Sequence, residues 1–161
     1  MYPEIRAILD DAEERYLRLE EIVALKHHVS SFAQRLQVYE VLRDNEIAIF
    51  QPIADQLLVA FPQHKQETIE RALKNWLGTL RYCAMAMLLN NPMFLQHRLL
   101  EWLTDIIQVH QTQGIDTTLY QFLITRLPEI LAEEQMALLQ PFLAQVEQAV
   151  MGTCSAATVP A

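Results

Sequence analysis

The sequence contains very few glycines, three among 161 residues. Glycine is the usual residue of tight turns, so its scarcity indicates few of them. Leucine, alanine, glutamine and glutamate are abundant, and all four favour helices. A chain of this length is also long enough to bury one hydrophobic core. The composition therefore predicts a single domain of the all-α class.

Cysteine and positive charge are scarce as well. Cys83 and Cys154 are too few for a disulfide framework, so we expect a reducing compartment. The formal net charge is −8. Non-specific binding to nucleic acid needs clustered lysine and arginine that displace counterions from phosphates. We therefore expect no nucleic-acid partner.

Long apolar runs are missing too. The longest, such as CAMAMLL, fall short of the roughly 20 residues that a membrane helix needs. The first residues, MYPEIRAILDDAEERY, are acidic and do not resemble a signal peptide. We expect a soluble, cytoplasmic protein without a membrane partner.

Familiar catalytic motifs are absent from the sequence. There is no glycine-rich phosphate loop, Gly-x-Ser-x-Gly elbow, Cys-x-x-Cys pair or His-Glu-x-x-His helix, so we expect no enzyme. The histidines are scattered, and a metal needs several converging ligands, so we predict no metal site. Haem held by His64 or His97 is a less favoured alternative, which rests on the globin-like size of the chain.

What the sequence does contain is a helical pattern along almost its whole length. Apolar residues recur at spacings of three and four between breakers. Pro62, the Asn90-Asn91-Pro92 run and Gly114 followed by Asp116 and Thr117 separate the segments. Seven helices are predicted, over residues 3–15, 18–43, 45–61, 66–90, 93–111, 116–131 and 133–151.

Prolines and the last residues refine this picture. Pro52 should kink the third helix unless neighbouring groups compensate, and such bends favour a globule of crossed helices. The final stretch, GTCSAATVPA, is small and polar, so we expect residues 1–151 to form the domain and residues 152–161 a disordered tail.

The fourth predicted helix begins with a pair of cations. Arg71 and Lys74 are three residues apart and therefore project from one face. They could hold two carboxylates of a ligand whose flat body lies on the apolar remainder of the helix. The alternative is that they pair with Glu67 and Glu70 on the surface.

Several segments resemble one family in the same order along the chain. RALKNWLGTLRYCAMAML resembles the long central helix of the phycobiliproteins, the light-harvesting globin relatives of cyanobacteria. DDAEERYLRLEEI, VLRDNEIAIFQPIADQLLVAFP, FLQHRLLEWL and TTLYQFLITRL resemble further helices of that family. The resemblance covers about residues 5–150. It implies a globin-like phycobiliprotein fold of about seven helices, including an N-terminal helical extension.

The resemblance also implies a site for a bilin, a linear tetrapyrrole. The family's bilin-attaching cysteine falls on Ala72, so the usual covalent bond cannot form. The basic residues that hold the bilin propionates fall on Arg71 and Lys74. The aspartate that accepts hydrogen bonds from the pyrroles falls on Asn75, which accepts them without a negative charge.

Aromatic residues complete the expected bilin site. The resemblance implies that Trp76, Trp102 and Tyr120 line the rings of the pigment. Glycine and threonine occupy two aromatic positions of the family at residues 78 and 79, while Trp102 occupies a glycine position. Cys83 lies further along the central helix as an alternative thioether site, although a buried structural cysteine is the favoured interpretation.

A further set of family residues concerns assembly. In phycobiliproteins an N-terminal aspartate of one subunit meets an arginine of the partner's central helix. Asp11 and Arg81 occupy those positions, and Tyr16 matches an aromatic residue at the same junction. The resemblance therefore implies a homodimer, with an intramolecular or surface use of these residues as the alternative.

Together these residues predict a non-enzymatic protein that carries biliverdin or phycocyanobilin non-covalently. This resembles the bilin-biosynthesis-associated globins, so a bilin-biosynthesis enzyme or another phycobilisome-related protein is the expected partner. One alternative is a pigment-free protein for interaction or assembly. A haem-binding globin is the less favoured alternative.

Overall fold

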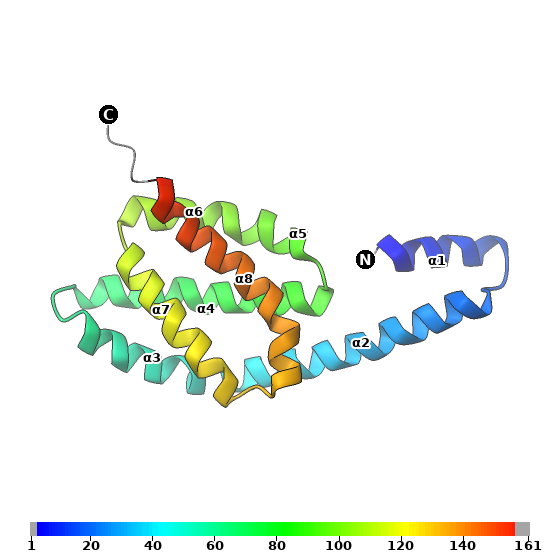
Figure 1. The fold of residues 1–161 in the computed structure, drawn as a ribbon, viewed down its shortest axis with the longest axis horizontal. Helices are drawn as coiled ribbons and strands as arrows, with labels where there is room; N and C mark the ends of the chain where they lie inside the picture. The colour runs from blue at the N-terminus through cyan, green and yellow to red at the C-terminus, as the bar shows by residue number, and fades with distance from the viewer. Residues whose placement is uncertain (1–2, 157–161) are drawn as a thin grey trace.

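The computed structural model describes residues 3–156, and in these residues every element is a helix. Helices α5, η1 and α6 follow one another without a loop, as do α7 and η2, so the described chain has seven helical segments, as predicted (Figure 1). The all-α, globin-like class is thereby confirmed. The elements are α1 (Pro3–Glu14), α2 (Leu19–Asp44), α3 (Glu46–Ala60), α4 (Gln66–Leu89), α5 (Pro92–Leu95), the π-helical η1 (Gln96–Leu100), α6 (Glu101–His110), α7 (Gln113–Arg126), the 3₁₀-helical η2 (Leu127–Glu129) and α8 (Glu133–Ala156).

Two helix ends are set by residues other than glycine. Asn90 ends α4 with φ of 47°, and Gln111 ends α6 with φ of 52°. The predicted break at Gly114 was wrong, because this glycine lies inside the first turn of α7. Helix α8 continues to Ala156, whereas the sequence predicted an end at residue 151. The last residues of the expected tail, 157–161, lie outside the described residues.

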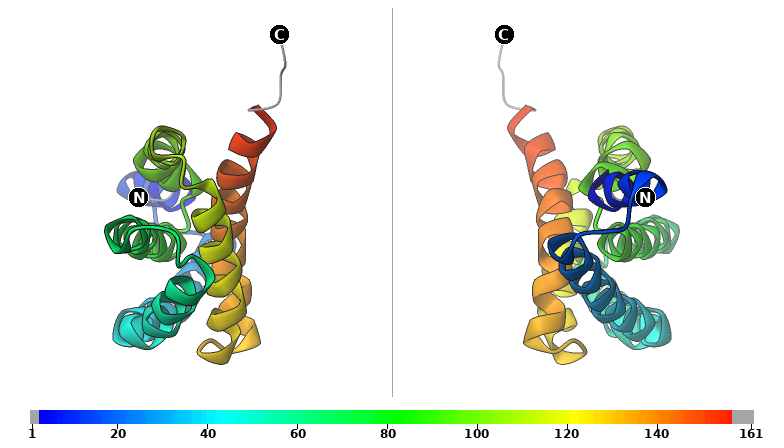
Figure 2. Two further views of the ribbon diagram at one scale, coloured as in Figure 1. Left: turned by 90° about the vertical axis from the view of Figure 1, so that its left-hand side faces the viewer. Right: turned by 90° about the vertical axis from the view of Figure 1, so that its right-hand side faces the viewer.

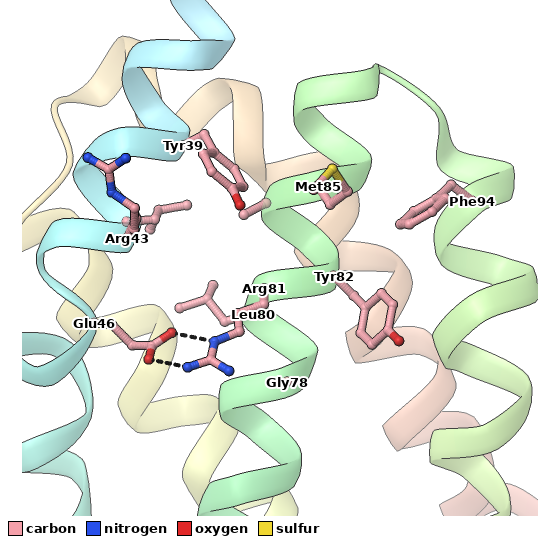
Figure 3. A pocket seen from close by; sticks show the side chains of 11 residues that line it. Tyr39, Arg43, Glu46, Gly78, Leu80, Arg81, Tyr82, Met85 and Phe94 are labelled. Carbon is pink, nitrogen blue, oxygen red and sulfur yellow. Dashed lines mark hydrogen bonds and ion pairs between the residues drawn. The ribbon is translucent and has the colours of Figure 1, made fainter. Parts of the chain in front are cut away.

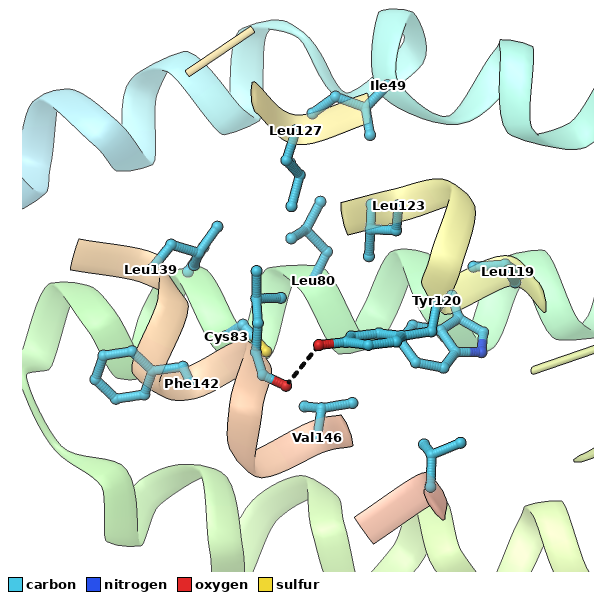
Figure 4. Packing of buried hydrophobic residues seen from close by; sticks show 14 of the residues in the cluster. Ile49, Leu80, Cys83, Leu119, Tyr120, Leu123, Leu127, Leu139, Phe142 and Val146 are labelled. Carbon is cyan, nitrogen blue, oxygen red and sulfur yellow. Dashed lines mark hydrogen bonds between the residues drawn. The ribbon is translucent and has the colours of Figure 1, made fainter. Parts of the chain in front are cut away.

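Helix α4 lies at the centre of the fold. It packs on α2, α3, α7 and α8, and its C-terminal end packs on α5 and η1. Helices α7 and α8 cross one face of the other helices (Figure 2). The spacing of the buried residues Trp76, Leu80, Cys83 and Met87 explains this position, because it gives α4 one continuous buried stripe. Figure 4 shows the core that forms between α4, α7 and α8.

Helix α3 passes through Pro52 without a break. A proline has no N–H, so the carbonyl group four residues before it, that of Ala48, loses its helical donor. Arg126 of α7 supplies a replacement, with its Nη2 atom 3.1 Å from the Ala48 oxygen. The neighbouring helix therefore provides the compensation that a proline inside a helix requires.

The N-terminal part of the chain projects from the globule. We call α1 and the first half of α2, residues 3–34, the N-terminal arm (Figure 1). The buried residues of α2 begin only at Arg35. Arg15 joins the two helices of the arm, since it forms ion pairs with Asp11 at 2.7 Å and with Glu21 at 2.6 Å. Several large apolar residues of the arm are exposed, namely Leu9, Tyr16, Leu19, Val23, Val29 and Phe32.

The described helices also bear on the membrane question. None of them combines the length and the apolar character that crossing a bilayer requires.

Candidate functional site

The two cations at the start of α4 are exposed. Within the described residues, neither Arg71 nor Lys74 forms a hydrogen bond or an ion pair. The surface pairing with Glu67 and Glu70 is therefore not present. Glu70 instead accepts a hydrogen bond from Gln66. Both cations remain available to an anionic ligand.

Between the cations the helix turns toward the core. Ala72 is buried, and Asn75 is half-buried with its backbone oxygen accepting a hydrogen bond from Thr79 at 2.8 Å. Cys83 is completely buried, and burial raises the pKa of its thiol to about 12. The thiolate, the form that attacks a bilin, is therefore scarce at neutral pH. The described part of α4 offers neither a thiol at residue 72 nor a reactive one at residue 83.

Trp76 is buried in an interaction that connects α4 with α7. Its indole N–H donates a hydrogen bond to Oδ1 of Asp116 over 2.8 Å. The hydroxyl of Thr112 donates to Oδ2 of the same carboxylate over 2.6 Å. Burial raises the pKa of Asp116, and the two hydrogen bonds only partly offset that effect. Asp116 as a whole residue is 2% exposed, and it lies in the first turn of α7.

Sequence reasoning missed the buried position of Asp116 and treated this residue as a helix cap. Instead α7 begins at Gln113, so Asp116 lies within the helix and faces the core. A signal was available, because Asp116 lies four residues before Tyr120 and beside Ile115, on the apolar side of the helix.

Tyr120 packs beside Trp76, with 5.8 Å between the ring centroids and an angle of 40° between the planes. Its hydroxyl group donates to the backbone oxygen of Leu143 over 3.5 Å and lies 3.3 Å from Glu147 (Figure 4). Burial is the main reason why the pKa of Tyr120 is raised. The predicted aromatic residues Trp76 and Tyr120 are thus brought together in the interior.

Trp102 lies apart from this buried aromatic pair. It is 48% exposed on α6, and it makes no ring contact with any described aromatic residue. Helix α4 packs more closely on α5 and η1 than on α6. Of the three predicted ring-lining residues, one is therefore on the surface.

The structure also shows the surroundings of the two candidate haem ligands and whether metal ligands converge. His64 and His97 are both exposed, the first against the ring of Phe61 and the second 3.5 Å from Glu101. Among the described residues, no three His, Cys, Asp or Glu side chains converge as metal ligands. The buried environment that an axial haem histidine requires is not found at either position.

A groove of about 550 Å³ lies elsewhere, between α2, α4 and α5 (Figure 3). At one end Arg81 forms two hydrogen bonds with Glu46, from Nε at 2.7 Å and from Nη2 at 2.6 Å. At the other end the rings of Tyr82 and Phe94 lie 6.2 Å apart. The remaining lining residues are Tyr39, Leu42, Arg43, Gly78, Leu80, Ala84 and Met85.

The predicted assembly residues have intramolecular surroundings in the single chain. Asp11 is paired with Arg15, and Arg81 with Glu46. Tyr16 is completely exposed at the junction of α1 and α2. Arg81 therefore borders the groove, while Asp11 and Tyr16 lie on the projecting arm.

Comparison with known proteins adds one finding to this geometry. A family model described as "Phycobilisome protein" matches residues 8–150. The match spans α2 to α7, most of α1 and the greater part of α8, and it includes the central helix with its exposed cations. A search of the curated proteins yields no match.

Proposed function

The chain belongs to the phycobilisome protein family, and from this membership we propose that it binds a linear tetrapyrrole non-covalently. Biliverdin and phycocyanobilin are the ligands proposed. The protein acts as a non-enzymatic carrier associated with bilin metabolism. Its delivery partner is a bilin-biosynthesis enzyme or a phycobilisome-related protein.

The free cations of α4 carry this proposal. Arg71 and Lys74 are exposed and without an ion-pair partner among the described residues, and they flank the buried methyl group of Ala72. A bilin has two propionates, which two cations on one helix face can neutralise. Because alanine cannot form a thioether, the pigment is held reversibly. Reversible binding suits a carrier.

The other predicted residues have supporting roles in the proposal. Asn75 is half-buried beside the cations, where its amide can meet a pyrrole nitrogen. Trp102 presents an exposed aromatic surface that a planar pigment can cover. Trp76 and Tyr120 are fully buried and packed on each other, so their proposed role of lining the pigment requires the site to open toward the core.

Absorption spectroscopy tests the ligand. Titration of the protein with biliverdin should shift and sharpen the pigment's red band at micromolar concentrations. The double variant Arg71→Glu, Lys74→Glu should weaken binding at least about tenfold, which corresponds to about 1.4 kcal/mol. The charge-matched control is Lys26→Glu, Arg98→Glu, because both of these cations are exposed on other helices. An unchanged spectrum, or equal losses in both double variants, contradicts the proposal.

We also propose that the protein is a homodimer in which the N-terminal arm of each chain docks on the other. The arm has large exposed apolar side chains, including Tyr16 and Leu19 at its bend. The groove of the second chain offers an apolar floor, an aromatic end and Arg81, which is complementary in charge to Asp11. The two surfaces occur once on each chain, so a twofold arrangement satisfies both.

A pigment-free interaction protein is the second candidate. The exposed arm and the groove favour it, because neither depends on a bound ligand. This candidate predicts a stable dimer that leaves the biliverdin spectrum unchanged. Co-expression with bilin-producing enzymes separates the two, since a colourless purified protein supports the second candidate and a coloured one the first.

A further inference from the structure

A second groove, of about 750 Å³, lies between η1 and α6 on one side and the C-terminal part of α8 on the other (Figure 1). We call it the amide groove, because four of the ten residues that line it are glutamines, and none of the ten belongs to α4. We infer that the amide groove binds a linear aliphatic polyamine, a cation whose ammonium groups are joined by methylene chains. The lining residues are Gln96, Leu100, Glu101, Thr104, Asp105, Gln108, Gln145, Gln148, Ala149 and Gly152.

The walls of the amide groove carry negative charge. Glu101 and Asp105 line it, whereas no lysine, arginine or histidine is among its ten lining residues. The two carboxylates are four residues apart, so they project from one face of α6. Asp105 forms no hydrogen bond or ion pair with a described residue, and Glu101 lies 3.5 Å from Nδ1 of His97. A cationic ligand is therefore complementary to this groove, and an anionic one is not.

The groove also contains hydrogen-bond acceptors that the described protein groups leave unused. Oε1 of Gln145 is closed off from solvent and has no hydrogen-bond partner among the described residues. A buried acceptor without a donor destabilises a fold, and the terminal torsion of a glutamine is broad enough to turn its oxygen toward a ligand. The hydroxyl of Thr104 donates to the backbone oxygen of Leu100 over 2.9 Å, so the Thr104 oxygen can still accept. An ammonium group only donates, which matches these acceptors and the two carboxylates.

The shape of the groove favours a linear ligand with apolar segments. On the η1 and α6 side, lining residues recur every four positions from Gln96 to Gln108, a length of about 18 Å along a helix axis. Leu100 is buried and Ala149 is half-buried, so methylene groups can cover them. A Cβ added at Gly152 would meet nothing within 4 Å, so the groove has open space there.

The π-helical element η1 is part of the same groove. Its first residue, Gln96, and its last residue, Leu100, both line it. Turns of π-helix are rare and occur frequently at functional sites. The irregular backbone of η1 therefore supports a binding function for this place in the fold.

Calorimetric titration with spermidine at low salt tests the inference without any pigment, so its result does not depend on the proposed function. The double variant Glu101→Gln, Asp105→Asn should weaken binding at least about tenfold, which corresponds to about 1.4 kcal/mol. The matched control is Asp10→Asn, Glu14→Gln, which removes one aspartate and one glutamate at the same spacing from exposed positions of α1. Absence of binding in the wild type, or equal losses in the two double variants, overturns the inference.

Two further variants test the groove without changing its charge. Gly152→Leu fills the open space, and Gln145→Leu removes the unpartnered oxygen, so each should weaken spermidine binding at least about tenfold. Gln145→Leu should also raise the melting temperature of the ligand-free protein, because an unsatisfied buried group is lost. Circular dichroism shows whether each variant is folded, and unchanged spermidine binding in either folded variant overturns the inference.

Comparison with a compact cation tests the linear form of the ligand. Among the described residues, no three His, Cys, Asp or Glu side chains converge as metal ligands. Spermidine should therefore bind at least about tenfold more tightly than Mg²⁺ in the same titration. Equal or tighter binding of Mg²⁺ overturns the assignment of a polyamine.

Discussion

Glu46 holds the arginine that the proposed homodimer uses. The carboxylate of Glu46 accepts two hydrogen bonds from Arg81, at 2.7 Å and 2.6 Å, at the edge of the groove (Figure 3). If Arg81 binds Asp11 of a second chain, the Glu46 pair must first open. We therefore predict that Glu46→Gln strengthens the homodimer. In this variant Arg81 can bind Asp11 of the second chain without first breaking an ion pair.

The exposure of the pair sets the size of this effect. The side chain of Arg81 is 68% exposed and that of Glu46 is 26% exposed, so solvent screens their attraction. Ion pairs of this kind contribute about 0.5 to 1 kcal/mol. A twofold dimer opens the pair twice, which gives about 1 to 2 kcal/mol in total. The dimer dissociation constant should fall about 5- to 30-fold.

Sedimentation equilibrium measures that constant directly. The control is Glu129→Gln, which removes the same charge from the exposed pair of Glu129 with Arg126, outside the groove. The difference between the two variants should shrink at high salt, since both effects are electrostatic. A Glu46→Gln dimer that is weaker than the wild type, or no tighter than the Glu129→Gln dimer, refutes the reasoning. Asp11→Asn should weaken the dimer in the same assay.

Three further outcomes follow from single residues. Gly78→Ala should raise the free energy of unfolding by about 0.5 to 1 kcal/mol, because an added Cβ meets nothing within 4 Å and alanine favours a helix; a lower melting temperature would contradict this. In a Cys154→Ser background, Cys83 should react with iodoacetamide at pH 8 roughly a thousandfold more slowly than an ordinary thiol, because its pKa is about 12. Rapid labelling of the native protein would refute this prediction. Burial raises the folded-state pKa of Asp116, so the native state binds more protons than the unfolded state above about pH 4. The free energy of unfolding therefore falls as pH rises through that folded pKa. Urea titrations across pH 4 to 7 should show this fall in the wild type and not in Asp116→Asn, and parallel curves would count against it.

The helices were predictable because their signals are local. Apolar spacing and breakers such as Pro62 and the Asn90-Asn91-Pro92 run are properties of neighbouring residues, and they locate the seven helical segments within a few residues. Motifs in the same order along the chain likewise indicate the family from the sequence alone. Gly114 misled the prediction because Gln111 adopts the positive φ that ends α6.

The contacts of the site were less predictable because they depend on tertiary packing. The Trp76–Asp116 bond joins residues 40 apart, and the Arg81–Glu46 pair joins residues 35 apart. Periodicity shows that Trp76 is on an apolar stripe, but it cannot show which residue of another helix meets its N–H. It likewise does not distinguish the buried Trp76 from the exposed Trp102, since both lie in amphipathic helices.

The replacement hydrogen bond at Pro52 ties two parts of the chain that are far apart in sequence. Arg126 donates to the Ala48 carbonyl across 78 residues, so α3 keeps its backbone satisfied only while α7 is in place. Separation of the two helices would leave that carbonyl without a protein donor. In native-state hydrogen exchange, the amides of α3 and α7 should therefore open as one cooperative unit.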